Sequence, residues 1–146
     1  MNKRLSIAET EPEAYKAMYA LVNYLTGTQV SKTHTNLLKI RASQINGCAY
    51  CIDMHTKEAL KSGETTQRIF LLNAWKETSL FTEEEKAVLA ITEEVTLISQ
   101  HGLSDKTYLR ATEFFDEHYI AQLIMAIVTI NAWNRISISS QTEVPG

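Results

Sequence analysis

The chain has 146 residues, 45% of them hydrophobic and 21% charged, a composition typical of one globular domain with a substantial core. Its formal net charge of −3 supplies no basic surface for nucleic acid or for an anionic membrane. The most apolar stretch, residues 120–130, is interrupted by Gln122 and Thr129 and is too short to span a bilayer. No apolar signal-peptide core is visible at the N-terminus. We therefore expect a cytoplasmic protein with neither nucleic-acid nor membrane partners.

Proline and glycine are rare, which favours helices along the whole chain. The two prolines, Pro12 and Pro145, lie near the ends, and only five glycines occur. Thr82 and Glu85 have the spacing of a helix-opening capping box. The alternation of apolar and polar residues that is typical of a strand is weak everywhere except over residues 135–139, which we interpret as a frayed helix end. The sequence therefore predicts a single all-α domain, residues 1–146, of six or seven helices. The expected helices cover residues 12–25, 35–44, 48–62, 64–75, 82–99, 104–117 and 119–136.

The most informative motif is a pair of cysteines followed by a histidine, namely Cys48, Cys51 and His55. Each helical residue advances by about 100°, so Cys51 and His55 lie one above the other. Cys48 and His55 are separated by only about 20° around the helix axis. All three side chains can therefore share one face of the helix expected over residues 48–62, which ends at Gly63.

Thiol chemistry explains why such a position is useful. A thiol attacks as its thiolate, which a helix N-terminus or a nearby cation favours. Asn46 and Gly47 precede the pair and can end one helix, so that the next begins at the cysteines. His55 can accept a proton from Cys51. The other thiol of the pair can then close a disulfide with an oxidised partner.

Three other roles are open to the cysteines. A structural zinc site needs four ligands, whereas Cys48, Cys51 and His55 supply three and the remaining histidines are isolated. Free cysteines are often inert core residues. The two cysteines of this chain lie only three residues apart, and this close spacing argues against an inert role. A structural disulfide that closes so short a loop stabilises little. We therefore favour redox chemistry.

The helix expected over residues 119–136 is apolar on nearly every side. Such a helix is buried either at the centre of its domain or against another subunit, and both alternatives stay open. The polar groups at its end can line a pocket or satisfy one another, and we favour the second. These groups are Asn131, Trp133, Asn134 and Arg135. Lys39 and Arg41 precede the cysteines, and we expect both to face solvent.

Residues 41–59, Arg-Ala-Ser-Gln-Ile-Asn-Gly-Cys-Ala-Tyr-Cys-Ile-Asp-Met-His-Thr-Lys-Glu-Ala, resemble the core of the AhpD-like alkylhydroperoxidase branch of the carboxymuconolactone decarboxylase superfamily. Weaker similarity continues through residues 72–75, 81–90 and 130–135, so the resemblance covers roughly residues 12–138. It implies an all-α AhpD-like fold and a homo-oligomer built on trimers or dimers. It also implies dithiol peroxidase or disulfide reductase activity.

The resemblance assigns roles by position in the motif. Cys51 is the thiol that attacks the peroxide, Cys48 is the thiol that resolves the product, and His55 is part of the proton relay. This order is opposite to that of thioredoxins, in which the first cysteine attacks. Local geometry agrees with the assignment, since Cys51 has the imidazole four residues later.

Two positions depart from the best-studied type of AhpD-like peroxidase. That type has a proton-transferring glutamate twelve residues before the first cysteine, where this chain has Asn36, which cannot take a proton near neutral pH. It also has a histidine directly before the second cysteine, where this chain has Tyr50. Glu93, with Glu94 beside it, is our candidate for the missing carboxylate, with a solvated helix face as the alternative.

Two functions are consistent with these patterns. The first is a dithiol oxidoreductase for antioxidant defence, which reduces organic hydroperoxides or exchanges disulfides and is itself reduced by a dithiol or a thiol protein. Apolar residues near the motif would suit an organic peroxide, although core packing explains them equally well. The second is an oligomeric redox sensor or binding protein without efficient turnover, which the incomplete proton relay favours. We expect neither a cofactor nor a metal in either case.

Overall fold

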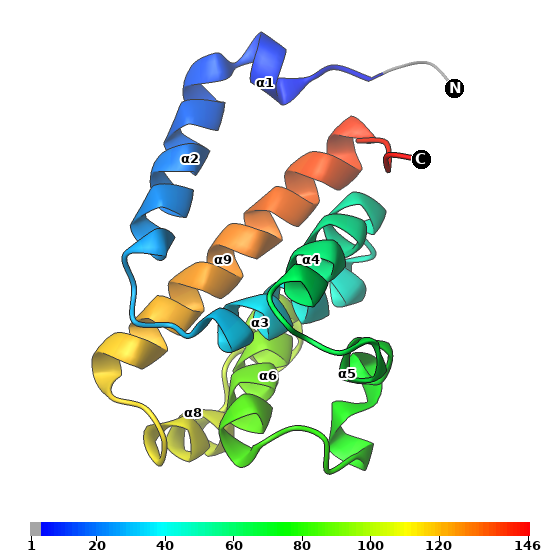
Figure 1. Ribbon diagram of the computed structural model, residues 1–146. Coiled ribbons are helices and arrows are strands. Elements are labelled where there is room, and N and C mark those ends of the chain that lie inside the picture. Colours follow the sequence, from blue (N-terminus) through cyan, green and yellow to red (C-terminus); the bar gives the residue numbers. More distant parts are fainter. Residues whose placement is uncertain (1–3) are drawn as a thin grey trace.

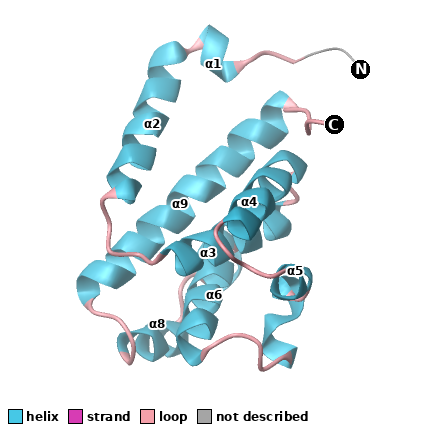
Figure 2. Cartoon of the chain, viewed as in Figure 1, coloured by secondary structure: helices cyan, strands magenta, loops and turns pink. Residues whose placement is uncertain are grey.

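The structure, a computed structural model, describes residues 4–146, and within this range it consists of helices and loops without a strand (Figures 1 and 2). The all-α prediction is confirmed. None of the helices described is long and apolar enough to cross a membrane. In chain order they are α1 (Ile7–Thr10), α2 (Pro12–Thr26), α3 (Lys32–Asn46), α4 (Ala49–Lys61), α5 (Thr66–Phe70), the 3-10 helix η1 (Leu72–Glu77), α6 (Glu83–Thr96), α7 (Ile98–His101), α8 (Asp105–Thr112) and α9 (Glu117–Ser140).

The helix predicted over residues 64–75 is divided in two. The α-helix α5 ends at Phe70, and the tighter helix η1 begins at Leu72, directly after the shared cap residue Leu71. Ala74 interrupts η1 with non-helical backbone angles, φ −117° and ψ 27°, so the segment bends there. Leu72 and Trp75, on either side of the bend, are both buried in a core cluster with residues of α3 and α6. Packing of these two side chains accompanies the departure from a regular α-helix.

Further boundaries differ from prediction. The helix predicted over residues 104–117 is shorter, because α8 ends at Thr112, and the helix predicted over residues 35–44 is longer, because α3 covers Lys32–Asn46. The helix predicted over residues 82–99 ends at Thr96, and the short helix α7 follows after Leu97. The predicted fraying over residues 135–139 is wrong, because α9 stays helical to Ser140. Ser137 in this last part is buried, so the end of α9 is packed against the domain.

The long helix α9 is the centre of the domain. Figure 1 shows it crossing the molecule with α2 on one side and α3, α4 and α6 on the other, and it packs against all four. Its Ile127 meets Leu38 of α3 and Val88 of α6 in the main core cluster. Central burial is thus observed for most of α9. Val128 and Ile138 nevertheless remain 44% and 45% exposed.

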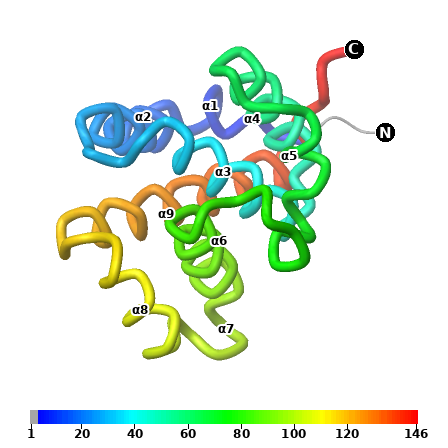
Figure 3. The backbone as a smooth tube through the Cα atoms, turned by 60° about the horizontal axis from the view of Figure 1, so that its bottom comes forward, coloured from blue at the N-terminus to red at the C-terminus, as the bar shows by residue number. Residues whose placement is uncertain are grey.

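The helix α2 lies beside α9 at the edge of the domain (Figure 3). None of its side chains is buried. Tyr15 and Tyr19 pack edge-on against Trp133 of α9, with ring centroids 5.2 and 5.7 Å away. Tyr19 is still 58% exposed, so the apolar side of α2 is only partly covered by its own chain.

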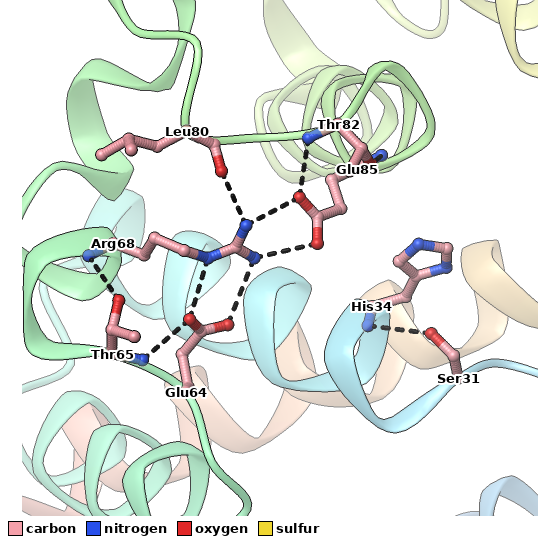
Figure 4. Close-up of polar contacts among 8 residues, drawn as sticks. All are labelled: Ser31, His34, Glu64, Thr65, Arg68, Leu80, Thr82 and Glu85. Atoms are coloured by element: carbon pink, nitrogen blue, oxygen red, sulfur yellow. Dashed lines mark hydrogen bonds and ion pairs between the residues drawn. The ribbon is translucent and has the colours of Figure 1, made fainter.

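A single arginine, Arg68 of α5, ties three segments of the chain together (Figure 4). Its guanidinium donates to both carboxylate oxygens of Glu64 at 2.8 and 3.2 Å and to both of Glu85 at 2.9 and 3.0 Å. It also donates to the carbonyl oxygen of Leu80 at 2.8 Å and lies 4.7 Å above the ring of Phe81. The start of α6 is therefore fixed to the α4–α5 loop through one half-buried cation.

Candidate active site

The junction of α3 and α4 is set by a glycine, as the sequence predicts. Gly47 follows the last residue of α3 with φ 71°, a left-handed conformation that costs glycine least. Cys48 then adopts an extended conformation and becomes the N-cap of α4. The Cys48 N–H donates back to the carbonyl oxygen of Ser43 at 3.0 Å, which closes the turn. The cysteine pair is thereby placed at the start of a helix.

Cys48 and Cys51 are joined by a disulfide. Both residues are only 1% exposed. The backbone N–H of Cys51 donates to Sγ of Cys48 at 3.3 Å, so Cys48 takes the capping role that serine or threonine usually fills. A thiolate at Cys48 would receive this hydrogen bond and the favourable field of the helix N-terminus.

His55 lies one helical turn after Cys51 and is 7% exposed. Its Nδ1 is 2.9 Å from Oε2 of Glu58. Burial lowers the pKa of His55, and the positive field of Lys39 lowers this pKa further, whereas Glu58 raises it. The net pKa lies below the usual value, so the imidazole is neutral at neutral pH and able to accept a proton.

Glu58 is the contact that sequence analysis missed. It lies three residues after His55 on α4, a spacing that places two side chains next to each other on a helix. That spacing was the signal that could have found it. Its side chain is 51% exposed, so the contact with His55 lies at the rim of the site rather than beneath it.

A network of buried amides fixes the junction from below. The Nδ2 group of Asn46, the last residue of α3, donates to Oδ1 of Asn131 and to Oδ1 of Asn134, each at 2.9 Å. Asn134 donates in turn to Oγ of Ser43 at 3.0 Å, and Arg135 donates to Asn131. Asn131, Asn134 and Arg135 are thus hydrogen-bonded to one another or to α3, which agrees with the alternative that the sequence favoured. It also anchors the residue two positions before Cys48.

Replacing Asn134 by alanine is expected to destabilise the protein by about 2–3 kcal/mol. The residue is fully buried, and its loss removes one hydrogen bond from Asn46 and one from Ser43 and leaves a small cavity between α3 and α9. Urea unfolding followed by circular dichroism measures this loss. Asn23→Ala on the exposed side of α2 is the matched control, with little expected change. Equal midpoints for the two variants would contradict the anchoring role.

The two candidate relay carboxylates are engaged in other contacts. Glu93 accepts from Nε1 of Trp75 at 2.6 Å and from Nε of Arg41 at 3.2 Å. Glu94 accepts from Ser104 and Thr107 and so supports the start of α8. None of these hydrogen bonds reaches a cysteine or His55. The solvated-face alternative does not describe them either, because both acids tie helices together.

The expected surroundings of the cysteines need two corrections. Arg41 was expected in solvent, but it is half-buried because it pairs with Glu93. Lys39 is likewise half-buried, and burial lowers the pKa of its ammonium group. Asn36, at the position of the missing glutamate, is 7% exposed, and Tyr50 is half-buried. Among residues 4–146 no three His, Cys, Asp or Glu side chains are grouped to hold a metal ion.

Comparison with known proteins identifies the family. The sequence model of the carboxymuconolactone decarboxylase family matches residues 12–94. The uncharacterized protein YdfG of Bacillus subtilis (strain 168) is 45% identical over 139 residues, 95% of each chain. The chain therefore belongs to the carboxymuconolactone decarboxylase family.

Comparison with solved structures shows which branch of the family the chain resembles. A protein of unknown function from Agrobacterium tumefaciens, described as a putative antioxidant defence protein AhpD, is 37% identical over 99% of both chains, with a TM-score of 0.95. The AhpD-like resemblance is thereby confirmed. The debrominase Bmp8 has a TM-score of 0.84 at 14% identity, covering 94% of this chain and 74% of its own, and shares the fold alone.

Proposed function

We propose that this protein is a dithiol oxidoreductase of antioxidant defence, which reduces organic hydroperoxides or exchanges disulfides through Cys48 and Cys51. The observation that carries the proposal is the disulfide at the start of α4 with a buried imidazole one turn after Cys51. The likeness to a putative antioxidant defence protein at 37% identity adds support. The family also contains other activities, so the reaction itself needs a direct test.

The proposed reaction uses the two thiols in turn. Cys51 gives its proton to His55, and the thiolate attacks one peroxide oxygen, so that an S–O bond forms while the O–O bond breaks. The leaving alkoxide takes the proton from the imidazolium and departs as an alcohol. Cys48 then attacks the sulfenic sulfur, and its proton leaves with the hydroxide as water. A dithiol or a thiol protein reduces the resulting disulfide.

Exposed apolar side chains support assembly with further copies of the chain. Tyr19 of α2 and Val128 and Ile138 of α9 are exposed apolar side chains that a second subunit can cover, which supports a homo-oligomer built on dimers or trimers. A cytoplasmic setting suits the proposal, because reductants there return disulfides to thiols.

A redox sensor without efficient turnover is the second candidate. The observation that favours it is the burial of the pair, because a disulfide whose residues are 1% exposed offers a thiol reductant little access, and turnover needs that reduction. In this function the disulfide would alter assembly instead of serving turnover. The oligomeric mass of reduced and oxidised protein separates the two candidates, since only a sensor of this kind changes mass.

The test of the proposed function is steady-state consumption of cumene hydroperoxide with dihydrolipoamide as the reductant. The double variant Cys48→Ser/Cys51→Ser is the control for thiol-independent loss of peroxide. We expect turnover by the natural protein and none by the double variant. Absence of turnover in a protein whose reduced thiols are still readily alkylated would reject the peroxidase and favour sensing.

A further inference from the structure

The contact between His55 and Glu58 fixes which ring nitrogen carries the hydrogen. Nδ1 of His55 lies 2.9 Å from Oε2 of Glu58. An ionised carboxylate can only accept, so the hydrogen of the neutral imidazole must be on Nδ1. The lone pair is then on Nε2, which has no hydrogen-bond partner within residues 4–146. Nε2 is therefore the nitrogen left to take a proton from a thiol.

Two charged groups near His55 act on its protonated form in opposite directions. Lys39 on α3 and Glu58 on α4 are the two charged groups whose fields act on the ring. When His55 takes a proton it becomes a buried cation, and Lys39 disfavours that cation while Glu58 favours it. From α3, position 36 offers only the amide of Asn36. Among residues 4–146, Glu58 is thus the negative charge that opposes Lys39 at the ring.

We propose that Glu58 is the positioning carboxylate of this redox site, which holds His55 with Nε2 free and stabilises its imidazolium form. The residue thereby supplies, from α4, the negative charge that Asn36 cannot supply from α3. The inference rests on the proposed function for its role in turnover. Its effect on the imidazole and on the thiol does not depend on turnover.

In the proposed cycle the proton of Cys51 passes through His55 to the leaving alkoxide. The S–H bond of Cys51 breaks and its proton passes to Nε2, which gives a thiolate and an imidazolium held by Glu58 at Nδ1. The thiolate then forms the S–O bond as the O–O bond of the hydroperoxide breaks. The alkoxide takes the proton from Nε2 and leaves as an alcohol. His55 returns to its neutral form, and Glu58 accepts the hydrogen bond from Nδ1 throughout.

The direction in which the pKa of the Cys51 thiol shifts when Glu58 is removed distinguishes two roles of Glu58. One role is to stabilise the imidazolium, and the other is only to add negative charge near the thiol. Deleting a negative charge near a thiol favours the thiolate through the field alone, which would lower the pKa of the thiol. Deleting a carboxylate that stabilises the imidazolium disfavours the thiolate–imidazolium pair, which would raise the apparent pKa of the thiol. Glu58→Ala is therefore expected to shift the pH profile of Cys51 upwards.

The experiment uses reduced protein with Cys48→Ser, which leaves one thiol and keeps a good N-cap for α4. Iodoacetamide alkylation of Cys51 is measured against pH, and nitrogen NMR of His55 reports the tautomer. With Glu58→Ala added, we expect the midpoint of the pH profile of alkylation to rise by about one pH unit. The rate of alkylation at pH 7 is then expected to fall about tenfold. The NMR signature of hydrogen on Nδ1 is expected to weaken.

Asp53→Ala is the matched control. Asp53 is a carboxylate on the same helix that pairs with Lys57 at 2.9 Å and has no hydrogen bond to His55. Its loss is expected to leave the midpoint unchanged or to lower it. A midpoint that does not rise with Glu58→Ala, or a tautomer that stays unchanged, would overturn the proposal. If both readouts change as expected while the natural protein consumes no hydroperoxide, only the proposed function fails.

Discussion

Replacing Cys51 by serine is expected to abolish peroxide reduction, whereas Cys48→Ser is expected to reduce one equivalent of peroxide and then stop. Cys51 has the imidazole one turn later on the same face of α4, and His55 is the proposed acceptor of its proton. Without Cys48 the sulfenic acid on Cys51 has no thiol beside it to form a disulfide. The two variants should therefore differ in product as well as in rate.

The measurement is a stoichiometric reaction without reductant, followed by trapping with dimedone and mass spectrometry. The adduct is expected on Cys51 in Cys48→Ser, and no adduct is expected in Cys51→Ser. The reverse result would assign the attack to Cys48. A physical reason for that outcome exists, because Sγ of Cys48 accepts the N–H of Cys51 at the start of α4. Urea midpoints of both variants check that the fold is retained.

The parts of the site that the sequence predicted are those fixed within a few residues of the chain. Gly47 ends α3 because a left-handed residue is needed there, and the capping box of Thr82 and Glu85 opens α6 as expected. The common face of Cys51 and His55 likewise follows from helical spacing alone. Such features depend on local backbone geometry, which residue types and their spacing specify directly.

The parts that were not predicted depend on packing between distant segments. Glu93 binds Trp75, 18 residues away, and Arg41, 52 residues away, so its partners are settled only when η1, α3 and α6 come together. The same packing half-buries Lys39, which spacing along α3 does not reveal. Glu58 is different, since its contact with His55 is local. Its i, i+3 spacing from His55 was enough to predict the contact, although the relay carboxylate was expected on α6.

Replacing Arg68 by methionine is expected to lower the free energy of unfolding by about 2–3 kcal/mol. Methionine keeps the apolar packing of the stem but leaves Glu85, whose side chain is 9% exposed, without its cation. Breaking a fully buried ion pair costs about 3–5 kcal/mol, and the 18% exposure of the Arg68 side chain reduces that figure through solvent screening. Urea unfolding at pH 7 measures the loss.

Arg110 provides a control with the same chemistry at the surface. Its guanidinium also pairs with two carboxylates, Glu83 and Glu113, and lies 4.6 Å from the ring of Phe114. Its side chain is 42% exposed, so water screens the pairs and Arg110→Met should leave the midpoint nearly unchanged. Equal losses in the two methionine variants would show that burial is not what gives the Arg68 network its strength.

The cost of losing Arg68 should depend on pH in a defined direction. Burial raises the pKa of Glu85, but hydrogen bonds from Arg68 and from the backbone N–H of Thr82 lower it, and the net pKa lies below the usual value. A carboxyl with a depressed pKa in the folded state stabilises the protein above its unfolded pKa of about 4.3, and this stabilisation disappears as pH falls through the folded pKa. The difference between the natural protein and Arg68→Met should therefore be full at pH 7 and shrink below about pH 4. A difference that stays constant from pH 7 to pH 3 would mean that methionine disturbs packing around Phe81 instead of leaving Glu85 unpaired.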